Sequence, residues 1–166
     1  AYRFFVDGIL KKGVPEFAGI KAISEVMEQE REDLFKLAME TVQFLAHSSS
    51  SLALFSLPGK GILLKDGWEE IVREPEFANR DFFSGFTDFL DDFEEGSQSL
   101  EMDEGINVFV GQESPLGKTG NFSLISCICR LPGNQKGVLS LAGPKRMAYK
   151  NNISLVDSLI KILDDF

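Results

Sequence analysis

The sequence has little of the residue types from which metal sites are built. Its 166 residues include one histidine, His47, and two cysteines, Cys127 and Cys129. A structural metal site needs about four ligands, and His47 is far in sequence from the cysteine pair. Cys127 and Cys129 alternate along an apolar stretch, so both point to one face of a strand. This pattern favours buried thiols, and we expect no metal and no cofactor.

Basic residues are also scarce. Lys and Arg number 17 against 26 Asp and Glu, which gives a formal net charge of −9. Binding to a nucleic-acid backbone depends on clustered cations, so we expect the chain itself not to contact DNA. An acidic cluster at Asp91, Asp92, Glu94 and Glu95 indicates a solvated helix face, because consecutive helical positions point in different directions.

Long apolar runs are missing as well. The longest, such as 51–57 and 137–142, fall far short of the roughly 20 residues that span a bilayer. The sequence opens without a basic, apolar and small-residue leader. We therefore expect a cytoplasmic protein with no membrane partner. The length and the hydrophobic content of 43% suit one core and a single domain over 1–166.

Helical periodicity is present in four parts of the chain. A short helix at 1–10 ends before Gly13 and Pro15, and apolar spacings of three and four predict one long helix over 19–47. A short helical stretch at 66–73 ends before Pro75. The last helix covers 153–163, with Asn151 or Asn152 as its N-cap.

A further helix carries a stripe of aromatic residues. Four phenylalanines spaced by four, three and four lie on one of its faces. Such a stripe is typical of core packing, which we favour, or of an interface with another chain. The residues are Phe82, Phe86, Phe89 and Phe93.

Alternating apolar residues predict five strands. A polar, glycine-bounded segment at 96–105 is predicted to be a loop. The order of helices and strands implies an α+β fold with an antiparallel sheet and helices gathered on one side. The predicted strands are 52–57, 62–64, 106–110, 122–131 and 137–143.

Two segments resemble catalytic motifs, but each lacks features that the motif requires. Five residues separate Gly111 from Gly117, where a phosphate-binding loop has four, and Gly117-Lys-Thr119 leads into a strand instead of a helix. His47 precedes four serines, but no nucleophile elbow or third orienting group accompanies it, and a histidine suits a helix C-terminus. We expect no catalytic residue and no enzyme.

A stretch near the C-terminus carries a family signature. The strand at 137–144 ends in Gly-Pro, and an Arg-Met-x-Tyr turn and a helix follow. This resembles the C-terminal signature of the HrcA repressors, although Lys145 and Ala148 replace the usual threonine and aspartate. The family-motif residues of this structural turn are Gly143, Pro144, Arg146, Met147 and Tyr149.

Three other stretches resemble the same family in the same order along the chain. Residues 2–7 are similar to the segment that follows the family's winged helix. Residues 73–77 (Arg-Glu-Pro-Glu-Phe) and 106–113 also match. Together the motifs extend from the first residues to the last helix.

The resemblance implies a GAF-like regulatory domain of a heat-inducible repressor of chaperone operons. It implies a homodimer, the GroEL chaperonin as a partner, and operator DNA bound through a winged-helix domain that this sequence lacks. Residues 1–14 would then be a linker helix from that domain. The alternative is a free-standing GAF-like sensor module that binds a small ligand or another protein.

The resemblance is weakest after the strand at 52–57. Family members carry further strands there and an inserted dimerisation subdomain, whereas a short turn follows here. Either this is a natural short form or part of the chain is missing. If the inserted subdomain is gone, the stripe of phenylalanines is a candidate substitute interface. No pH, metal or redox trigger is visible, so we expect heat to act by loosening packing.

Overall fold

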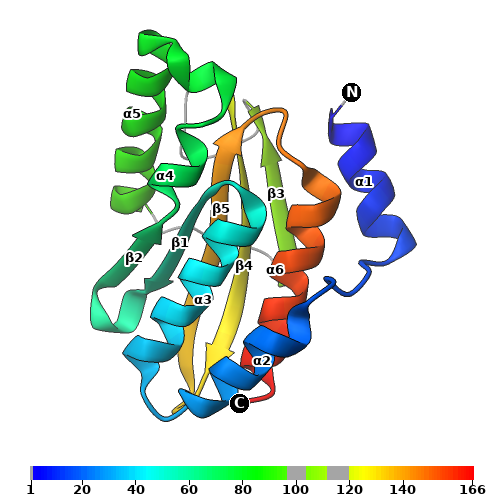
Figure 1. Cartoon of the computed structure of the whole chain (residues 1–166), viewed down its shortest axis with the longest axis vertical. Coiled ribbons are helices and arrows are strands. Elements are labelled where there is room, and N and C mark those ends of the chain that lie inside the picture. The colour runs from blue at the N-terminus through cyan, green and yellow to red at the C-terminus, as the bar shows by residue number, and fades with distance from the viewer. Residues whose placement is uncertain (1, 97–103, 112–119) are drawn as a thin grey trace.

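A computed structural model of the chain describes residues 2–96, 104–111 and 120–166. Its centre is a five-stranded sheet (Figure 1). Every neighbouring pair is antiparallel, in the order β2-β1-β5-β4-β3. The predicted α+β class with an antiparallel sheet is therefore confirmed. The strands are β1 (Leu52–Leu57), β2 (Ile62–Asp66), β3 (Ile106–Val110), β4 (Phe122–Leu131) and β5 (Gln135–Pro144).

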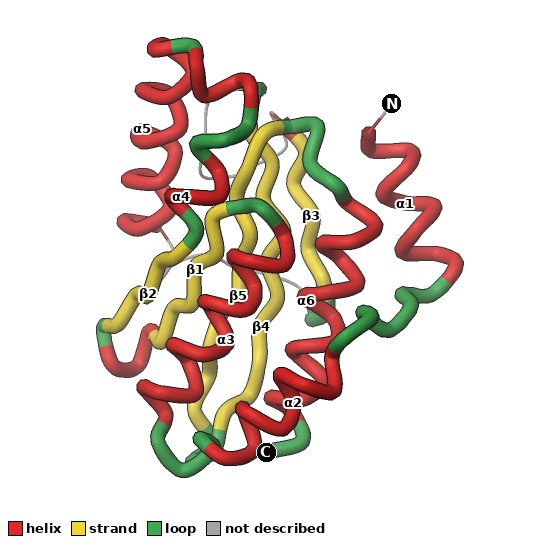
Figure 2. The backbone as a smooth tube through the Cα atoms, in the orientation of Figure 1, coloured by secondary structure: helices red, strands yellow, loops and turns green. Residues whose placement is uncertain are grey.

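Helices flank the sheet and connect its strands (Figure 2). Among the elements that lie wholly within the described residues, two are 3₁₀ turns, η1 (Pro58–Lys60) and η2 (Pro75–Ala78). The α-helices are α1 (Tyr2–Lys12), α2 (Ile20–Gln29), α3 (Leu34–Ser49), α4 (Trp68–Ile71), α5 (Arg80–Gly96) and α6 (Tyr149–Asp164).

Alternation along the strands creates two separate cores. On β1, Ala53 and Phe55 face a cluster formed with α2, α3 and α6, which we call the α3–α6 core. Leu52 and Leu54 face the opposite cluster, formed with α4, η2 and α5, which we call the α5 core. Both faces of the sheet are therefore buried.

The prediction that the helices gather on one side is wrong. Helices α2, α3 and α6 cross in front of the sheet in Figure 1, while α5 stands at the left and buries its phenylalanines against the other face. The apolar residues at even positions of β1 and β4 need their own cover, because an exposed apolar face would be costly in water.

The single long helix predicted over 19–47 is two helices. Helix α2 ends at Glu30, whose N–H donates to the carbonyls of Val26 and Met27. Asp33 then begins α3, because its side chain accepts a hydrogen bond of 3.1 Å from the N–H of Lys36. Apolar periodicity continues through the break because both helices pack on the same face of the sheet, so the periodicity conceals the break.

The first turn of α6 also differs from the sequence prediction. The helix starts at Tyr149, after Ala148 as N-cap, with no capping side chain. The Asn151 side chain instead donates to the Ser48 carbonyl at 3.4 Å, and Asn152 is buried. The prediction that Asn151 or Asn152 caps this helix is therefore wrong. The predicted loop at 96–105 lies mostly outside the described residues, which resume at Glu104.

Candidate functional site

The predicted buried thiols are confirmed. Cys127 and Cys129 are free and buried in the α3–α6 core. Burial raises the pKa of each thiol to about 12, with a smaller contribution from the nearby carboxylate of Asp164. Both thiols are therefore held in their neutral form, which is a poor nucleophile and metal ligand.

The residues that resembled catalytic motifs form no catalytic arrangement in the described part of the chain. The His47 side chain is largely exposed, and its Nδ1 lies 3.7 Å from a carboxylate oxygen of Glu70. The hydroxyl of Ser49 donates back to the Ala46 carbonyl at the end of α3. Residues 112–119 of the phosphate-loop-like segment lie outside the described residues, and Gly120 and Asn121 lead directly into β4.

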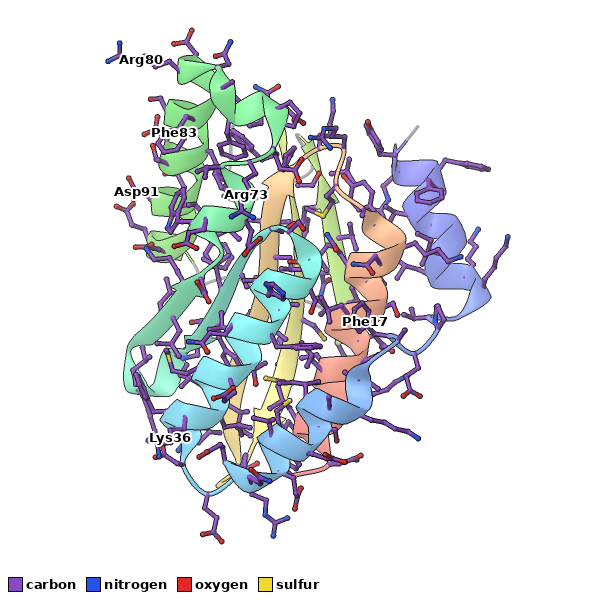
Figure 3. The ribbon with its side chains drawn as sticks, viewed as in Figure 1. Phe17, Lys36, Arg73, Arg80, Phe83 and Asp91 are labelled. Atoms are coloured by element: carbon purple, nitrogen blue, oxygen red, sulfur yellow. The ribbon has the colours of Figure 1, made fainter. Side chains whose placement is uncertain are left out.

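The acidic cluster is a solvated helix face, as predicted. Asp91, Asp92 and Glu95 are exposed on α5, and Glu94 forms an ion pair with Lys65 of β2. Figure 3 shows Asp91 on the outer side of α5. Within the described ranges no group of three His, Cys, Asp or Glu residues could hold a metal ion.

The phenylalanine stripe faces the sheet. Phe86, Phe89 and Phe93 are buried in the α5 core, and Phe82 packs against it while partly buried. The Phe86 ring makes edge contacts with Phe77 and Phe122, with ring centroids 5.0 and 5.2 Å apart. The rings therefore pack in the core, which is the interpretation that the sequence favoured.

The family-motif turn connects β5 to α6 and is held by its tyrosine. Tyr149 is buried, and its hydroxyl lies 2.8 Å from the Ser123 hydroxyl of β4. The same hydroxyl donates to the Lys145 carbonyl inside the turn. The Met147 N–H donates to the Pro144 carbonyl at 3.1 Å, so the turn is closed by its own backbone and by a hydroxyl network.

Arg146 of the turn extends to a different part of the chain. Its guanidinium bonds the carboxylates of Glu74 and Glu76 at 2.6 Å each. Glu74 and Glu76 belong to the segment at 73–77, which resembled the family independently. The structure therefore brings two sequence motifs together through one cation, in what we call the Arg146 clamp.

The clamp shifts the pKa values of Glu76 and Arg146. The hydrogen bond from Arg146 holds the pKa of Glu76 below its ordinary value of 4.5, against a smaller opposing effect of burial. The two carboxylates likewise raise the pKa of Arg146. All three groups remain partly exposed, so the clamp is a half-buried ion triad.

Sequence reasoning named Arg146 but missed its partners and the hydroxyl of Ser123. The signal for Glu74 and Glu76 was available as a motif, but nothing in the sequence shows which motifs touch. Gly67 was also missed. It has a φ of +110°, and a Cβ there would lie 2.4 Å from the Ser51 carbonyl oxygen, so only glycine fits the entry to α4.

The sheet order and the helices on both faces define a GAF-like α+β domain. A solved crystal structure of a hypothetical protein has the same fold, with a TM-score of 0.68 over 99% of this chain and 75% of that chain, at 13% sequence identity. Identity this low shows the fold alone.

The family model described as "HrcA protein C terminal domain" matches residues 12–153, and the chain belongs to the HrcA family. The resemblance inferred from the turn at 143–149 is thereby confirmed. Similar curated proteins are named heat-inducible transcription repressor HrcA. That of Oceanobacillus iheyensis is 30% identical over 149 residues, which cover 89% of this chain and 42% of that protein.

Two further relatives of that name support the assignment. That of Xanthomonas campestris pv. campestris is 27% identical over 89% of this chain and 43% of its own length. That of Natranaerobius thermophilus is 28% identical over 79% of this chain and 37% of its own length. The matched part of the chain thus corresponds to less than half the length of each of these three relatives. No described helix has the length and apolar character needed to cross a bilayer.

Proposed function

We propose that this chain is the regulatory and oligomerisation domain of a heat-inducible repressor of chaperone operons. The observation that carries the proposal is the family match over residues 12–153, together with relatives that are named heat-inducible transcription repressors. In this proposal the domain acts in the cytoplasm, is not an enzyme, and works as a homodimer with the GroEL chaperonin as a partner.

Operator DNA is proposed to be bound by a winged-helix domain and not by this chain. The formal net charge of −9 opposes close approach to phosphate groups, because DNA affinity depends on neutralising them with cations. Helix α1 is proposed to be the linker to that domain. The phenylalanine stripe is buried in its larger part, so a dimer that used it would involve mainly Phe82.

Heat is proposed to act by loosening the packing of this domain. The thiols are neutral and buried, and the marginal stability of domains makes thermal loosening a sufficient signal. The Arg146 clamp joins the turn before α6 to the segment before α5, so its loss would weaken one connection between the two helical layers.

The test uses the full-length repressor that contains this chain, with a reporter gene behind a chaperone-operon promoter. Arg146→Ala is expected to lower the temperature at which repression is lost, in step with the unfolding temperature of the domain. Arg73→Ala is the matched control. The Arg73 side chain is more exposed than that of Arg146, and its guanidinium makes one long contact, 3.9 Å, with the carboxylate of Glu70.

Two results would contradict the proposal. If repression responded neither to the two variants nor to heat, the domain would have no part in heat regulation. An onset of unfolding far above the temperature of derepression would exclude loosened packing as the signal.

A further inference from the structure

A groove opens between α1 and the start of α6. Two adjoining cavities of about 520 and 480 Å³ share three lining residues. We call this surface the α1 groove. It is lined chiefly by Phe4, Phe5, Lys12, Pro15, Tyr149 and Lys150.

Helix α1 presents aromatic rings to solvent beside this groove. Phe4 is 87% exposed and Phe5 is 53% exposed, whereas Val6 is the one buried residue of the helix. Gly8 lies in the wall of the larger cavity, and no atom approaches within 4 Å of where its Cβ would be. Exposed rings next to an open apolar hollow mark a surface built for contact.

Two residues near the start of α1 hold the helix against the rest of the domain. The Arg3 guanidinium donates to the Val108 carbonyl of β3 at 2.7 Å and to Asp7 one turn along. The Tyr2 ring lies 5.9 Å from that of Tyr149. These contacts fix which side of α1 faces outward.

The larger cavity of the groove is positive in a protein that is strongly negative, whereas the smaller cavity also has Glu16 in its wall. Lys12 and Lys150 line the larger cavity, which has no carboxylate in its wall. Neither lysine has an ion pair in the described part of the chain. Uncompensated lysines at an apolar hollow select for a negatively charged and apolar occupant, and they oppose a positive one.

We propose that the α1 groove binds an acidic segment of a partner protein, which inserts one apolar side chain beside Phe4 and Phe5. Carboxylates of the segment then lie next to Lys12 and Lys150. A symmetric contact with a second copy would bring the same lysines together. An anionic membrane would repel a chain of net charge −9. This inference does not depend on the proposed role in repression.

The probe is a library of short random peptides selected on the purified chain, with the enriched sequences measured by fluorescence anisotropy. We expect them to pair Asp or Glu with Leu, Phe or Trp, and to bind more weakly as salt is added. Phe4→Ser and the double variant Lys12→Glu/Lys150→Glu should each weaken binding at least about tenfold, or 1.4 kcal/mol.

Matched controls separate binding from folding. Phe35→Ser removes another ring, 52% exposed on α3, and Lys60→Glu reverses an exposed charge in η1; both should leave the affinity unchanged. Phe4 is so exposed that Phe4→Ser should keep the unfolding temperature.

Three outcomes would overturn the proposal. The first is enrichment of neutral or basic peptides, or peptides whose affinity ignores Phe4→Ser. The second is binding to vesicles of phosphatidylcholine and phosphatidylglycerol that displaces the peptides. The third is a dimer in sedimentation that Phe4→Ser dissociates, which would make a second copy the occupant.

Discussion

The two faces of the sheet are buried by different means. On the α3–α6 side the helices α2, α3 and α6 cover a large, mostly aliphatic cluster, and its one buried phenylalanine is Phe55 of β1. On the α5 side the cluster has eleven buried residues, of which five are phenylalanines. Helix α5, α4 and η2 supply six of the eleven, and four of these six are phenylalanines. Because each ring buries a large area, one helix can seal a face that otherwise requires several. Stability is consequently concentrated in few residues of the α5 core.

The largest expected effect tests that concentration directly. Phe86→Ala should lower the free energy of unfolding by about 3–5 kcal/mol, because the ring is fully buried among other rings and the cavity left behind relaxes only partly. Urea unfolding of the purified chain measures the loss. Phe35→Ala, at a ring on α3 that is 52% exposed, is the control and should cost under about 1 kcal/mol. Equal costs for the two would refute the comparison.

The next effect concerns the junction of the two cores. Gly67→Ala should cost about 1–3 kcal/mol, because alanine is strained at a φ of +110° and its Cβ would meet the Ser51 carbonyl and the Ala46 side chain. The unfolding temperature measured by circular dichroism reports the change. Gly85→Ala in α5 should be neutral or stabilising, since its Cβ would only touch the Phe122 ring at 3.6 Å.

The Arg146 clamp links the two layers and should contribute less. Arg146→Ala is expected to cost about 1 kcal/mol at neutral pH, the upper range for exposed ion pairs. Because the folded pKa of Glu76 is depressed, the stabilisation is present above pH 4.5 and is lost as the pH falls through the folded value.

The gap in unfolding temperature between wild type and Arg146→Ala should therefore be constant above about pH 5.5 and close at lower pH. It should also narrow in high salt. A gap that persisted unchanged at pH 3 would show that Arg146 acts through packing of its aliphatic stem and not through charge.

The smallest expected effect falls on a family-motif residue. Gly143 sits where the two cores meet, and a Cβ there would find Met147 and the Ser51 hydroxyl at 3.5 Å, an ordinary contact distance. Gly143→Ala should change the free energy of unfolding by no more than about 0.5 kcal/mol. A larger loss would show that the turn needs glycine for a reason other than space.

Much of the fold could be predicted because its strands and helices are set locally. Alternation at 52–57, 106–110 and 122–131 placed β1, β3 and β4 within their observed bounds. The spacing of the phenylalanines predicted α5 and its buried face. Local patterns did not predict the break between α2 and α3, because both helices contribute to one apolar face. They also did not predict which face of the sheet each helix covers.

The sequence by itself determined the family, the acidic surface and the burial of Cys127 and Cys129. Each depends on residue types and spacings that are read along the chain. The tertiary structure alone decided that Arg146 meets Glu74 and Glu76, some 70 residues away, and that Phe4 and Phe5 flank a positive groove. The physical reason is that charges and rings act over distances in space, and only the folded chain sets which distant segments become neighbours.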